Sequence, residues 1–251
     1  MRAWAFTDRG GVRERNEDAL LWGEVLWADE MDVPAEREPA SANFMGAVAD
    51  GMGGGPGGAQ AARAVLANLA ALPLPAFWDE ARDMVTRSLA GTAMELVRLA
   101  DADMGLAGMG TAVAGLWARG DRALAFNCGD CRVYRIRHGY FDLVTKDHSL
   151  VYELYASGAI TEEEMATHHL KHILTSSVQD SPDQPRAFFR EVPLQDGDEF
   201  LVCSDGVWEA LPRSEMERMA SGAAPGEGAF RMASALKGLG CRDNTTFLWL
   251  R

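Results

Sequence analysis

The order of the segments along this chain predicts an α+β fold in which antiparallel β-sheet packs against helices, and three observations support it. Short apolar runs with strand character occupy the N-terminal fifty residues. Two helical patterns follow, and a second group of consecutive strand patterns begins near residue 111. Strands and helices therefore come in groups and do not alternate one by one, which favours antiparallel sheet over parallel βαβ units.

The strand predictions depend on apolar runs that end at turn residues. Residues 44–49 form the clearest run, which ends at Asp50 and a glycine-rich loop, and His138-Gly139 suits a tight turn between two strands. The acidic segment 29–43 contains two prolines and no clear period, which predicts an exposed loop. Strands are predicted for residues 3–6, 18–27, 44–49, 111–117, 123–127, 133–137, 140–144, 188–192, 199–204 and 245–250.

Helices are predicted where apolar residues recur at intervals of three and four. Residues 76–99 show this pattern over many turns, with charged residues between the apolar ones. The segment from 165 to 186 is polar and lacks a strong period. The other helical segments are 59–71, two short helices around Gly158 within 149–164, and stretches within 207–220 and 228–237.

Length and composition bound the class of protein. The 251 residues suit one large domain, and no change in composition divides the chain, so we expect a single domain over residues 1–251. The formal net charge of −13 opposes binding to duplex DNA or to an anionic membrane. Four cysteines are too few for a disulfide scaffold, and no signal segment or membrane span is apparent, so a soluble cytoplasmic protein is expected.

Acidic residues recur at the ends of predicted strands, where rigid elements can present side chains to a site. Buried carboxylates repel one another unless a cation lies between them, and a set without histidine partners suits hard ions such as Mg²⁺ or Mn²⁺. A single Asp-Gly pair commonly caps a turn, so the argument depends on the whole set. The set consists of Glu17, Asp18, Asp50, Asp130, Asp205 and Asp243.

Seven short motifs extend over nearly the whole chain, from about residue 7 to the last predicted strand. They are GVRERNED at 11–18, ADGMGG at 49–54, GMGT at 108–111, GDCR at 129–132, TKDHS at 145–149, SDG at 204–206 and DN at 243–244. Each motif alone is weak. In this order they closely resemble the PPM (type 2C) family of metal-dependent protein serine/threonine phosphatases, above all its compact bacterial branch.

The resemblance implies a sandwich of two antiparallel sheets flanked by helices (α-β-β-α), with a small flap at about residues 150–179 that shapes access for the substrate. It also implies two Mn²⁺ or Mg²⁺ ions at one end of the sandwich. In the family pattern Asp50 bridges both ions and the Gly51 carbonyl binds one of them. Asp205 and Asp243 hold the other ion.

The remaining acidic residues receive supporting roles from the same resemblance. Glu17 and Asp18 act through water molecules, and Asp130 with Asp205 offers a third, weaker ion site. Two cations lower the pKa of a bridging water and neutralise the phosphate, so that an anion can attack an anion. Arg13 matches the phosphate-binding arginine of the family, because its fork of N–H groups can hold two phosphate oxygens.

One departure concerns the general acid. Many eukaryotic relatives carry a histidine after Asp-Gly that is proposed to protonate the leaving group, whereas this chain has Met52. Methionine has no proton to donate, so the leaving alkoxide must take its proton from water or another group. Bacterial relatives share this methionine, so activity is still expected.

Weaker signals compete with this interpretation. Gly53, Gly55 and Gly58 fit the GxGxxG pattern of dinucleotide-binding proteins, but Asp50 would repel a pyrophosphate and no second strand follows the predicted helix. His168 and His172 are four residues apart, for which a solvated flap surface is favoured over a helical metal site.

The thiols give a further hypothesis. Residues two apart on a strand share a face, so thiols placed two residues before a proposed ligand would lie near the metals and make the site sensitive to oxidants or Zn²⁺. Asp147 and His148 are expected to cap the helix that follows them. The thiols concerned are Cys128, Cys203 and Cys241.

Three functions compete for this chain. A phosphatase acting on phosphorylated proteins is favoured, because Asp50, Asp205 and Asp243 are all intact. A non-catalytic module that binds phosphoproteins on the same fold is the alternative, and a nucleotide binder, testable by NADH titration, is the third. The expected partners are phosphorylated proteins and a cognate bacterial serine/threonine kinase, and a monomer is expected.

Overall fold

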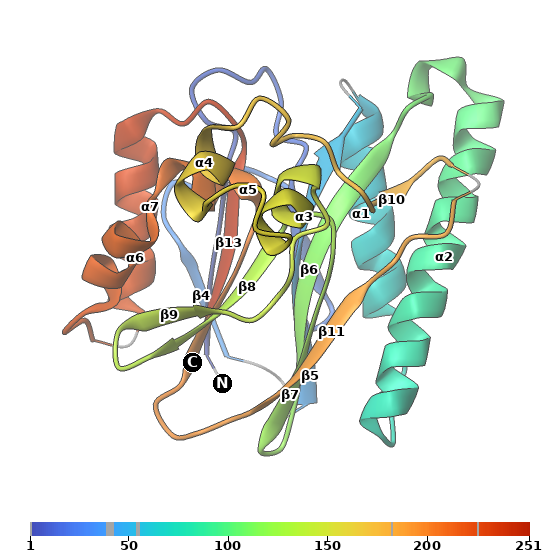
Figure 1. The fold of residues 1–251 in the computed structure, drawn as a ribbon. Coiled ribbons are helices and arrows are strands. Elements are labelled where there is room, and N and C mark those ends of the chain that lie inside the picture. Colours follow the sequence, from blue (N-terminus) through green and yellow to red (C-terminus); the bar gives the residue numbers. More distant parts are fainter. Residues whose placement is uncertain (1, 39–42, 54–55, 182, 225) are drawn as a thin grey trace.

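The computed structural model describes residues 2–38, 43–53, 56–181, 183–224 and 226–251. Two antiparallel β-sheets pack face to face, and helices cover both outer faces (Figure 1). This α-β-β-α arrangement confirms the predicted α+β class. Among the described helices, none is both long and apolar enough to cross a bilayer.

The first sheet brings the two ends of the chain together. Strand β1 (Ala3–Asp8) pairs with the last strand, β13 (Thr245–Leu250), and the N and C labels lie together in the lower half of Figure 1. The backbones of Arg2 and Arg251 hydrogen-bond to each other. The strand order is β4-β1-β13-β12-β8-β9. The other strands of this sheet are β4 (Ala35–Arg37), β8 (Arg132–Arg137), β9 (Tyr140–Leu143) and β12 (Glu199–Cys203).

The second sheet is built around two long central strands, β5 (Asn43–Met52) and β6 (Gly110–Arg119), which pair along their whole length. The strand order is β11-β7-β6-β5-β2-β3, and a two-residue strand, β10, pairs with β6 beside this path. Its remaining strands are β2 (Ala19–Trp22), β3 (Val25–Trp27), β7 (Arg122–Cys128), β10 (Val178–Gln179) and β11 (Phe188–Pro193).

Each sheet has its own helical layer. Helices α1 (Pro56–Ala70) and α2 (Trp78–Ala102) cover the second sheet, and the short helix η1 (Met104–Leu106) follows them. The first sheet is covered by α5 (Asp205–Ala210), α6 (Arg213–Ala220) and α7 (Glu227–Leu239). The flap contains α3 (Leu150–Ala156) and α4 (Glu162–Thr167), which lie near the upper edge of the sandwich in Figure 1.

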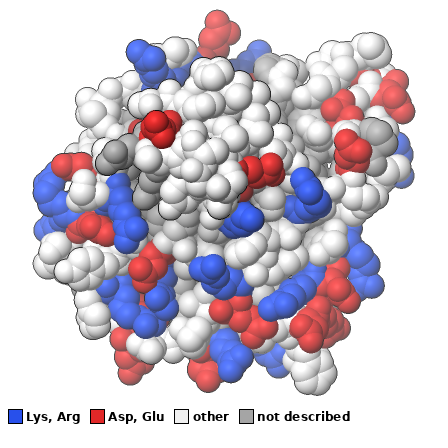
Figure 2. Space-filling model, viewed as in Figure 1, with Lys and Arg blue, Asp and Glu red and all other residues white. Residues whose placement is uncertain are grey.

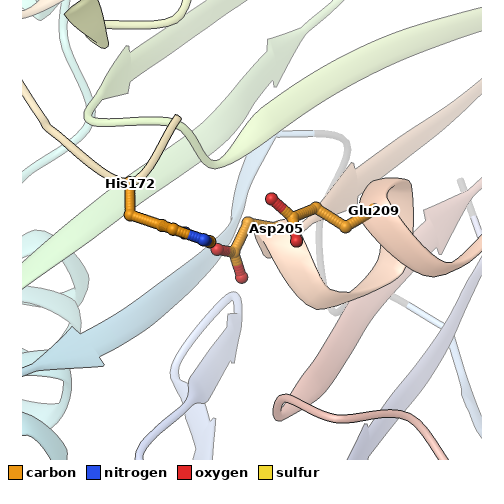
Figure 3. Close-up of side chains that lie close together, drawn as sticks. All are labelled: His172, Asp205 and Glu209. Carbon is orange, nitrogen blue, oxygen red and sulfur yellow. The ribbon is translucent and has the colours of Figure 1, made fainter. Parts of the chain in front are cut away.

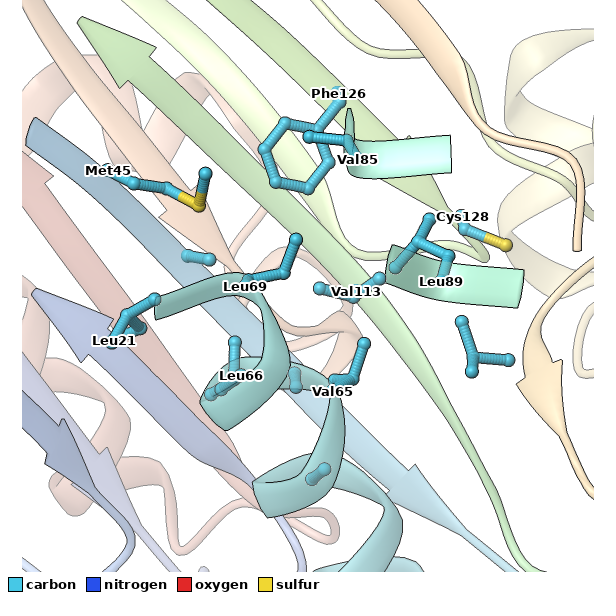
Figure 4. Close-up of a cluster of buried hydrophobic side chains, with 14 of the residues drawn as sticks. Leu21, Met45, Val65, Leu66, Leu69, Val85, Leu89, Val113, Phe126 and Cys128 are labelled. Atoms are coloured by element: carbon cyan, nitrogen blue, oxygen red, sulfur yellow. The ribbon is translucent and has the colours of Figure 1, made fainter. Parts of the chain in front are cut away.

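Three apolar layers hold the sandwich together. The middle layer lies between the sheets, where Val48, Val133 and Leu248 are fully buried. A second layer lies between β5–β7 and helices α1 and α2, and Leu66 and Phe126 both belong to it (Figure 4). The third lies under α5–α7. Fully burying one aliphatic or aromatic side chain stabilises the folded state by about 1.5–3 kcal/mol. The three layers therefore hold the strands firmly, and the strands in turn position the loops at the sandwich ends.

Three segments differ from the sequence predictions. Residues 18–27 form a hairpin, β2–β3, and not one strand, because Gly23 turns the chain with φ 61°. Within the predicted loop 29–43, β4 pairs with the edge of β1, and residues 39–42 lie outside the described part. The short β10 lies in a segment that shows no period. In contrast, the predicted turn is confirmed, since His138 and Gly139 both have positive φ.

Surface charge is mixed on the side of the molecule seen in Figure 2. Lys and Arg side chains are interspersed there with Asp and Glu. The net charge of −13 is therefore not gathered into a single acidic surface on this face.

Candidate metal centre

One end of the sandwich opens into a cleft of about 820 Å³. Strands of both sheets end there, and the loops that follow them line its floor and walls. Seven of the eight residues proposed for the site from the sequence contribute to this lining: Arg13, Glu17, Asp50, Gly51, Asp130, Asp205 and Asp243. The eighth, Asp18, is buried next to the floor.

The carboxylates come from separate elements of both sheets. Asp50 lies near the end of β5, and Asp130 follows β7. Asp205 is the first residue of α5, directly after β12, while Asp243 precedes β13. Residues up to 193 positions apart in the chain therefore meet because their strands end at the same edge of the sandwich.

Three glycines allow these loops to approach closely. A Cβ atom on Gly51 would overlap the Gly58 carbonyl, and one on Gly58 would overlap the Glu17 carboxylate. Gly206 has the same relation to the Asn244 carbonyl, which brings the start of α5 against the loop of Asp243. The glycines of the GxGxxG pattern thus serve close packing, although Gly55 lies outside the described residues. Helix α1 is followed by α2 and not by a strand, so no βαβ unit forms among these elements.

Asn244 ties the N-terminal loop to the C-terminal one. Its side-chain amide donates to the carbonyls of Arg9 and Arg15 at 2.9 and 3.0 Å, and its oxygen accepts from the Glu17 amide at 2.8 Å. The segment carrying Arg13 and Glu17 is therefore held against Asp243. In the sequence, Asn244 stands out only as part of the DN motif at 243–244. Its role could not be predicted, because nothing local indicates which distant carbonyls its side-chain amide will reach.

The central carboxylates repel one another when they are ionised, which helps to raise their pKa values. Burial is the main cause that raises the pKa of Asp50 well above its usual value, and the charges of Asp205, Asp18 and Asp130 add to it. The pKa of Asp130 is also raised well above normal, again by burial first and then by Asp205 and Asp147. Burial raises the pKa of Asp205 to about 6 although it shares a hydrogen bond with Asp50.

Two buried oxygens in this cluster are left without a hydrogen-bond partner among the described residues. They are Oδ1 of Asp18 and Oδ1 of Asp205. The other oxygen of Asp18 accepts a hydrogen bond from Ser204 Oγ at 2.8 Å, and burial raises the pKa of Asp18 to about 7. Unpartnered buried oxygens and mutually repelling carboxylates are what a site for hard divalent cations presents before an ion is added, so the residues fit such ions.

Arg13 lies at the mouth of the cleft and is more than half exposed. Its Nη2 donates to Asp243 Oδ2 at 2.6 Å, and this hydrogen bond is the largest cause that raises the pKa of Arg13. The other edge of a guanidinium remains free to receive an anion, because its five N–H donors point along more than one edge.

The flap contributes one histidine to the cleft. His172 and Leu174 line it, while Lys171 Nζ forms an ion pair with Glu209 Oε2 at 2.8 Å. Helix α4 ends at Thr167, so the chain is not helical between His168 and His172 and the four-residue spacing does not place them on one helical face. His168 instead stacks on His169.

A buried ion pair supports the cleft from below. Arg132 donates to both oxygens of Asp147, with a shortest distance of 2.6 Å, and its guanidinium lies 3.6 Å from the ring centre of Trp208. Trp208 Nε1 in turn donates to the Asp130 carbonyl at 3.1 Å. The prediction that Asp147 caps the next helix is wrong, since Ser149 caps α3.

His148 does not cap that helix either, because its Nδ1 accepts a hydrogen bond from the Gly129 amide. The prediction failed since a histidine and an aspartate near a helix start look alike in sequence whether they bond to the helix or across the fold. Here the nearby loop after β7 offers a backbone partner, and Ser149 is one residue closer to the helix.

The four cysteines are buried and unpaired. Cys128 and Cys203 face the helical layers, and burial raises both of their pKa values. The thiol most affected by the carboxylates is Cys131, which the thiol hypothesis left out; burial and the charges of Asp50 and Asp130 raise its pKa well above normal. Raised pKa values keep thiols protonated and slow their oxidation, and the expected oxidant sensitivity stays a prediction.

Comparison with known proteins gives this geometry a family. The profile of the Protein phosphatase 2C family matches residues 29–237. The serine/threonine phosphatase stp of Listeria innocua is 32% identical over 230 residues, which cover 87% of this chain and 82% of that protein.

Solved structures agree with this match. A serine/threonine phosphatase of S. agalactiae superposes with a TM-score of 0.84 at 27% identity, covering 99% of this chain and 98% of that one. The catalytic domain of the protein phosphatase PstP, solved with two manganese ions, gives a TM-score of 0.76 at 26% identity, with 99% and 98% covered. The chain belongs to the protein phosphatase 2C family.

Proposed function

We propose that this chain hydrolyses phosphoserine and phosphothreonine in proteins with the help of divalent ions held in the cleft. The observation that carries the proposal is the meeting of Asp50, Asp130 and Asp205 at one sandwich end, where burial and mutual repulsion raise their pKa values. Such a cluster is costly without cations, and Arg13, which lines the same cleft, would bind the phosphate.

The ligand set follows the positions around the cleft. Asp50 would contact both ions, and the Gly51 carbonyl would bind one of them. Asp205 and Asp243 would hold the other. Glu17 and Asp18 would act through water molecules, and Asp130 with Asp205 would offer a weaker third site. These residues supply oxygen ligands only, which suits Mn²⁺ or Mg²⁺.

The chain's own groups then orient the reaction. When bound, the ions would activate a water molecule and offset the charge of the phosphate. Arg13 would donate hydrogen bonds to the phosphate oxygens from the guanidinium edge that does not contact Asp243. Met52 also lines the cleft and carries no acidic proton, so the leaving alkoxide would be protonated from water.

The biological setting is proposed more broadly. The substrates would be proteins phosphorylated by a cognate serine/threonine kinase. The enzyme would be a single cytoplasmic phosphatase domain over residues 1–251 that works as a monomer. The PstP relative with two manganese ions supports Mn²⁺ as the first ion to test.

The direct test is hydrolysis of p-nitrophenyl phosphate and of a phosphothreonine peptide. Wild type is expected to turn over both with Mn²⁺, to lose activity in EDTA and to recover when Mn²⁺ is restored. Asp205→Asn is expected to remain inactive at saturating Mn²⁺, because it lacks one charged ligand. Binding of the phosphopeptide without any metal-dependent turnover would reject the enzyme and favour a phosphoprotein-binding module.

Arg13 gives a second measurement. Arg13→Ala is expected to lower kcat/KM for the phosphopeptide by about 10- to 150-fold, the loss that follows from removing about 1.5–3 kcal/mol of charged hydrogen bonding. Arg13→Lys should fall between the two, since an ammonium keeps the charge but not the fork. Arg9→Ala is the matched control, because Arg9 donates to the Glu14 carbonyl and does not line the cleft. Equal kinetics for both alanine variants would remove Arg13 from phosphate binding.

A further inference from the structure

The flap connects the cleft to a basic surface on the outside of the molecule. At its inner end it lies against helix α5, and the side chains that meet there are His172, Asp205 and Glu209 (Figure 3). Leu174 also lines the cleft. The carbonyl of the next residue, Thr175, accepts a hydrogen bond from Arg186 Nη2 at 2.8 Å, and Arg186 is exposed. The Arg186 guanidinium therefore lies directly beyond the cleft wall.

Two more exposed cations lie beside Arg186. Lys146 follows β9, which is the edge of the first sheet, and Arg190 lies on β11, which is the edge of the second. Asn127 joins these edges, because its Nδ2 donates to the Lys146 carbonyl at 2.8 Å and its backbone pairs with Phe188 of β11. Figure 1 shows α3 above both strands, and Figure 2 shows Lys and Arg side chains below it. We refer to Lys146, Arg186 and Arg190 as the basic surface.

The three charges act on the same neighbouring side chains. Burial is the main cause that lowers the pKa of His148, and the charges of Arg186 and Lys146 add to it. Lys146 Nζ lies 5.7 Å from the centre of the Tyr152 ring. Burial raises the pKa of Tyr152, and the charge of Arg190 opposes this shift. The three cations therefore belong to one surface at the base of the flap.

This surface keeps its positive charge. Among the described residues, none of its three cations forms an ion pair. The acidic side chains of the adjoining strands and turn already have other partners: Asp142 pairs with Arg135, Asp198 with Arg137, and Glu191 with Arg82 and Arg122. A chain of net charge −13 thus presents a locally positive area next to its cleft.

We infer that the basic surface binds an acidic segment of the phosphoprotein substrate, close in sequence to the phosphorylated residue. The inference rests on the proposed phosphatase function. A protein of net charge −13 repels anionic substrates at long range, and a positive area beside the cleft offsets this repulsion where the substrate must arrive. Arg190 also lies over an aromatic ring, 5.6 Å from the centre of Phe188, so its side chain is partly ordered before binding.

The position of Arg186 sets how far the acidic residues lie from the phosphate. Arg186 contacts Thr175, one residue beyond the cleft-lining Leu174, and consecutive Cα atoms are about 3.8 Å apart. An extended substrate covers about 3.3 Å per residue, so acidic residues about three to six positions from the phosphothreonine reach about 10–20 Å from it. Residues at that spacing can contact the basic surface while the phosphate occupies the cleft.

The first test compares two phosphothreonine peptides at saturating Mn²⁺. One peptide carries Asp or Glu at the positions given above, on both sides of the phosphothreonine, and the other carries Asn or Gln there. Wild type should hydrolyse the acidic peptide with a kcat/KM about tenfold higher, mainly through a lower KM, because several exposed ion pairs form at once. This preference should largely disappear in 1 M NaCl, where the Debye length falls to about 3 Å.

Charge reversal locates the effect. Lys146→Glu, Arg186→Glu and Arg190→Glu together should remove the preference and leave hydrolysis of p-nitrophenyl phosphate unchanged, because that substrate has no segment to bind. Since Arg186 also holds Thr175, the pair Lys146→Glu and Arg190→Glu is measured as well and should lose most of the preference. The matched control makes the same change of net charge at three exposed, unpaired arginines of α1 and α2, which are Arg63, Arg87 and Arg98.

A binding measurement separates this inference from the proposed function. The labelled acidic phosphopeptide is titrated into Asp205→Asn protein, which should not turn it over, and fluorescence anisotropy should show about tenfold weaker binding after the three reversals. Equal kcat/KM for the two peptides in wild type, equal affinities in the titration, or the same loss in the α1–α2 control would overturn the inference. Charge-dependent binding by a wild type that hydrolyses neither peptide would reject the proposed function and retain the docking surface.

Discussion

Replacing Asp50 with asparagine is expected to abolish metal-dependent hydrolysis while making the metal-free protein more stable. Asp50 is the central member of the carboxylate cluster, because the charges of Asp205, Asp18 and Asp130 all act on it. If it contacts both ions, its loss removes several kcal/mol of stabilisation from the transition state, so kcat/KM should fall at least about 10³-fold.

The stability effect has the opposite sign, because an amide carries no charge to be repelled. In EDTA the melting temperature of Asp50→Asn should exceed that of wild type by about 2–4 °C, the shift that about 1 kcal/mol produces in a chain of this size. In Mn²⁺ the order should reverse, since only wild type gains the free energy of binding both ions.

The gain in EDTA should also depend on pH. Folding raises the pKa of Asp50 above its value in the unfolded chain. In the pH interval between these two pKa values, the folded protein keeps a proton on Asp50 that the unfolded chain has lost. Stability of metal-free wild type therefore falls as the pH rises through this interval. The advantage of Asp50→Asn should be larger at pH 8 than at pH 5.

Thermal melts at both pH values, with EDTA and with Mn²⁺, measure all three effects. Asp101→Asn, at an exposed position near the end of α2, is the control and should change neither activity nor the metal dependence of melting. A metal-free Asp50→Asn protein that melts below wild type at pH 8 would show that the carboxylate is stabilising without ions, against the repulsion described above.

The second large effect is expected at the buried pair beneath the cleft. Arg132→Ala should destabilise the protein by about 3–5 kcal/mol, because it leaves the Asp147 carboxylate charged and buried without its partner. For a chain of this length that lowers the melting temperature by about 6–20 °C. Urea unfolding followed by circular dichroism measures the change directly.

A matched surface pair separates burial from charge. Arg218 pairs with Glu215 at the same 2.6 Å, but its side chain is 70% exposed, against 11% for Arg132. Arg218→Ala should therefore cost less than about 1 kcal/mol. Replacing Arg132 and Asp147 together by methionine and leucine should recover much of the loss, since an apolar pair leaves no charge unpaired. Equal losses for Arg132→Ala and Arg218→Ala would contradict the argument.

The same substitution should reach the metal centre. Arg132 stacks on Trp208, and Trp208 holds the Asp130 carbonyl, so loosening this support moves Asp130 within the cleft. We expect Arg132→Ala to raise the Mn²⁺ concentration needed for half-maximal activity, measured well below its melting temperature. This buried support was not predicted, because the GDCR and TKDHS motifs do not reveal that Arg132 and Asp147 face each other.

Local pattern identified most of the elements, and the exceptions are instructive. The strand at 44–49 was predicted from a continuous apolar run, which the structure buries on both faces, and helix α2 was predicted from a strong period that buries one face. Strand β4 falls within a predicted loop, because two of its three residues are exposed and only pairing with β1 holds them as a strand. The two residues of β10 likewise gain strand geometry from β6 alone. Short strands that form only by pairing at a sheet edge have no recognisable pattern in their own sequence.

The sequence by itself determined the class of fold, the family and the identity of the acidic residues, since periodicity, turn residues and ordered motifs are local properties. Only the tertiary structure decided that these carboxylates share one cleft, that Asn244 joins its two loops and that His172 reaches Asp205 and Glu209. The physical reason is that burial, repulsion and ligand geometry depend on distances between strands far apart in the chain. Those distances are set by how the two sheets pack.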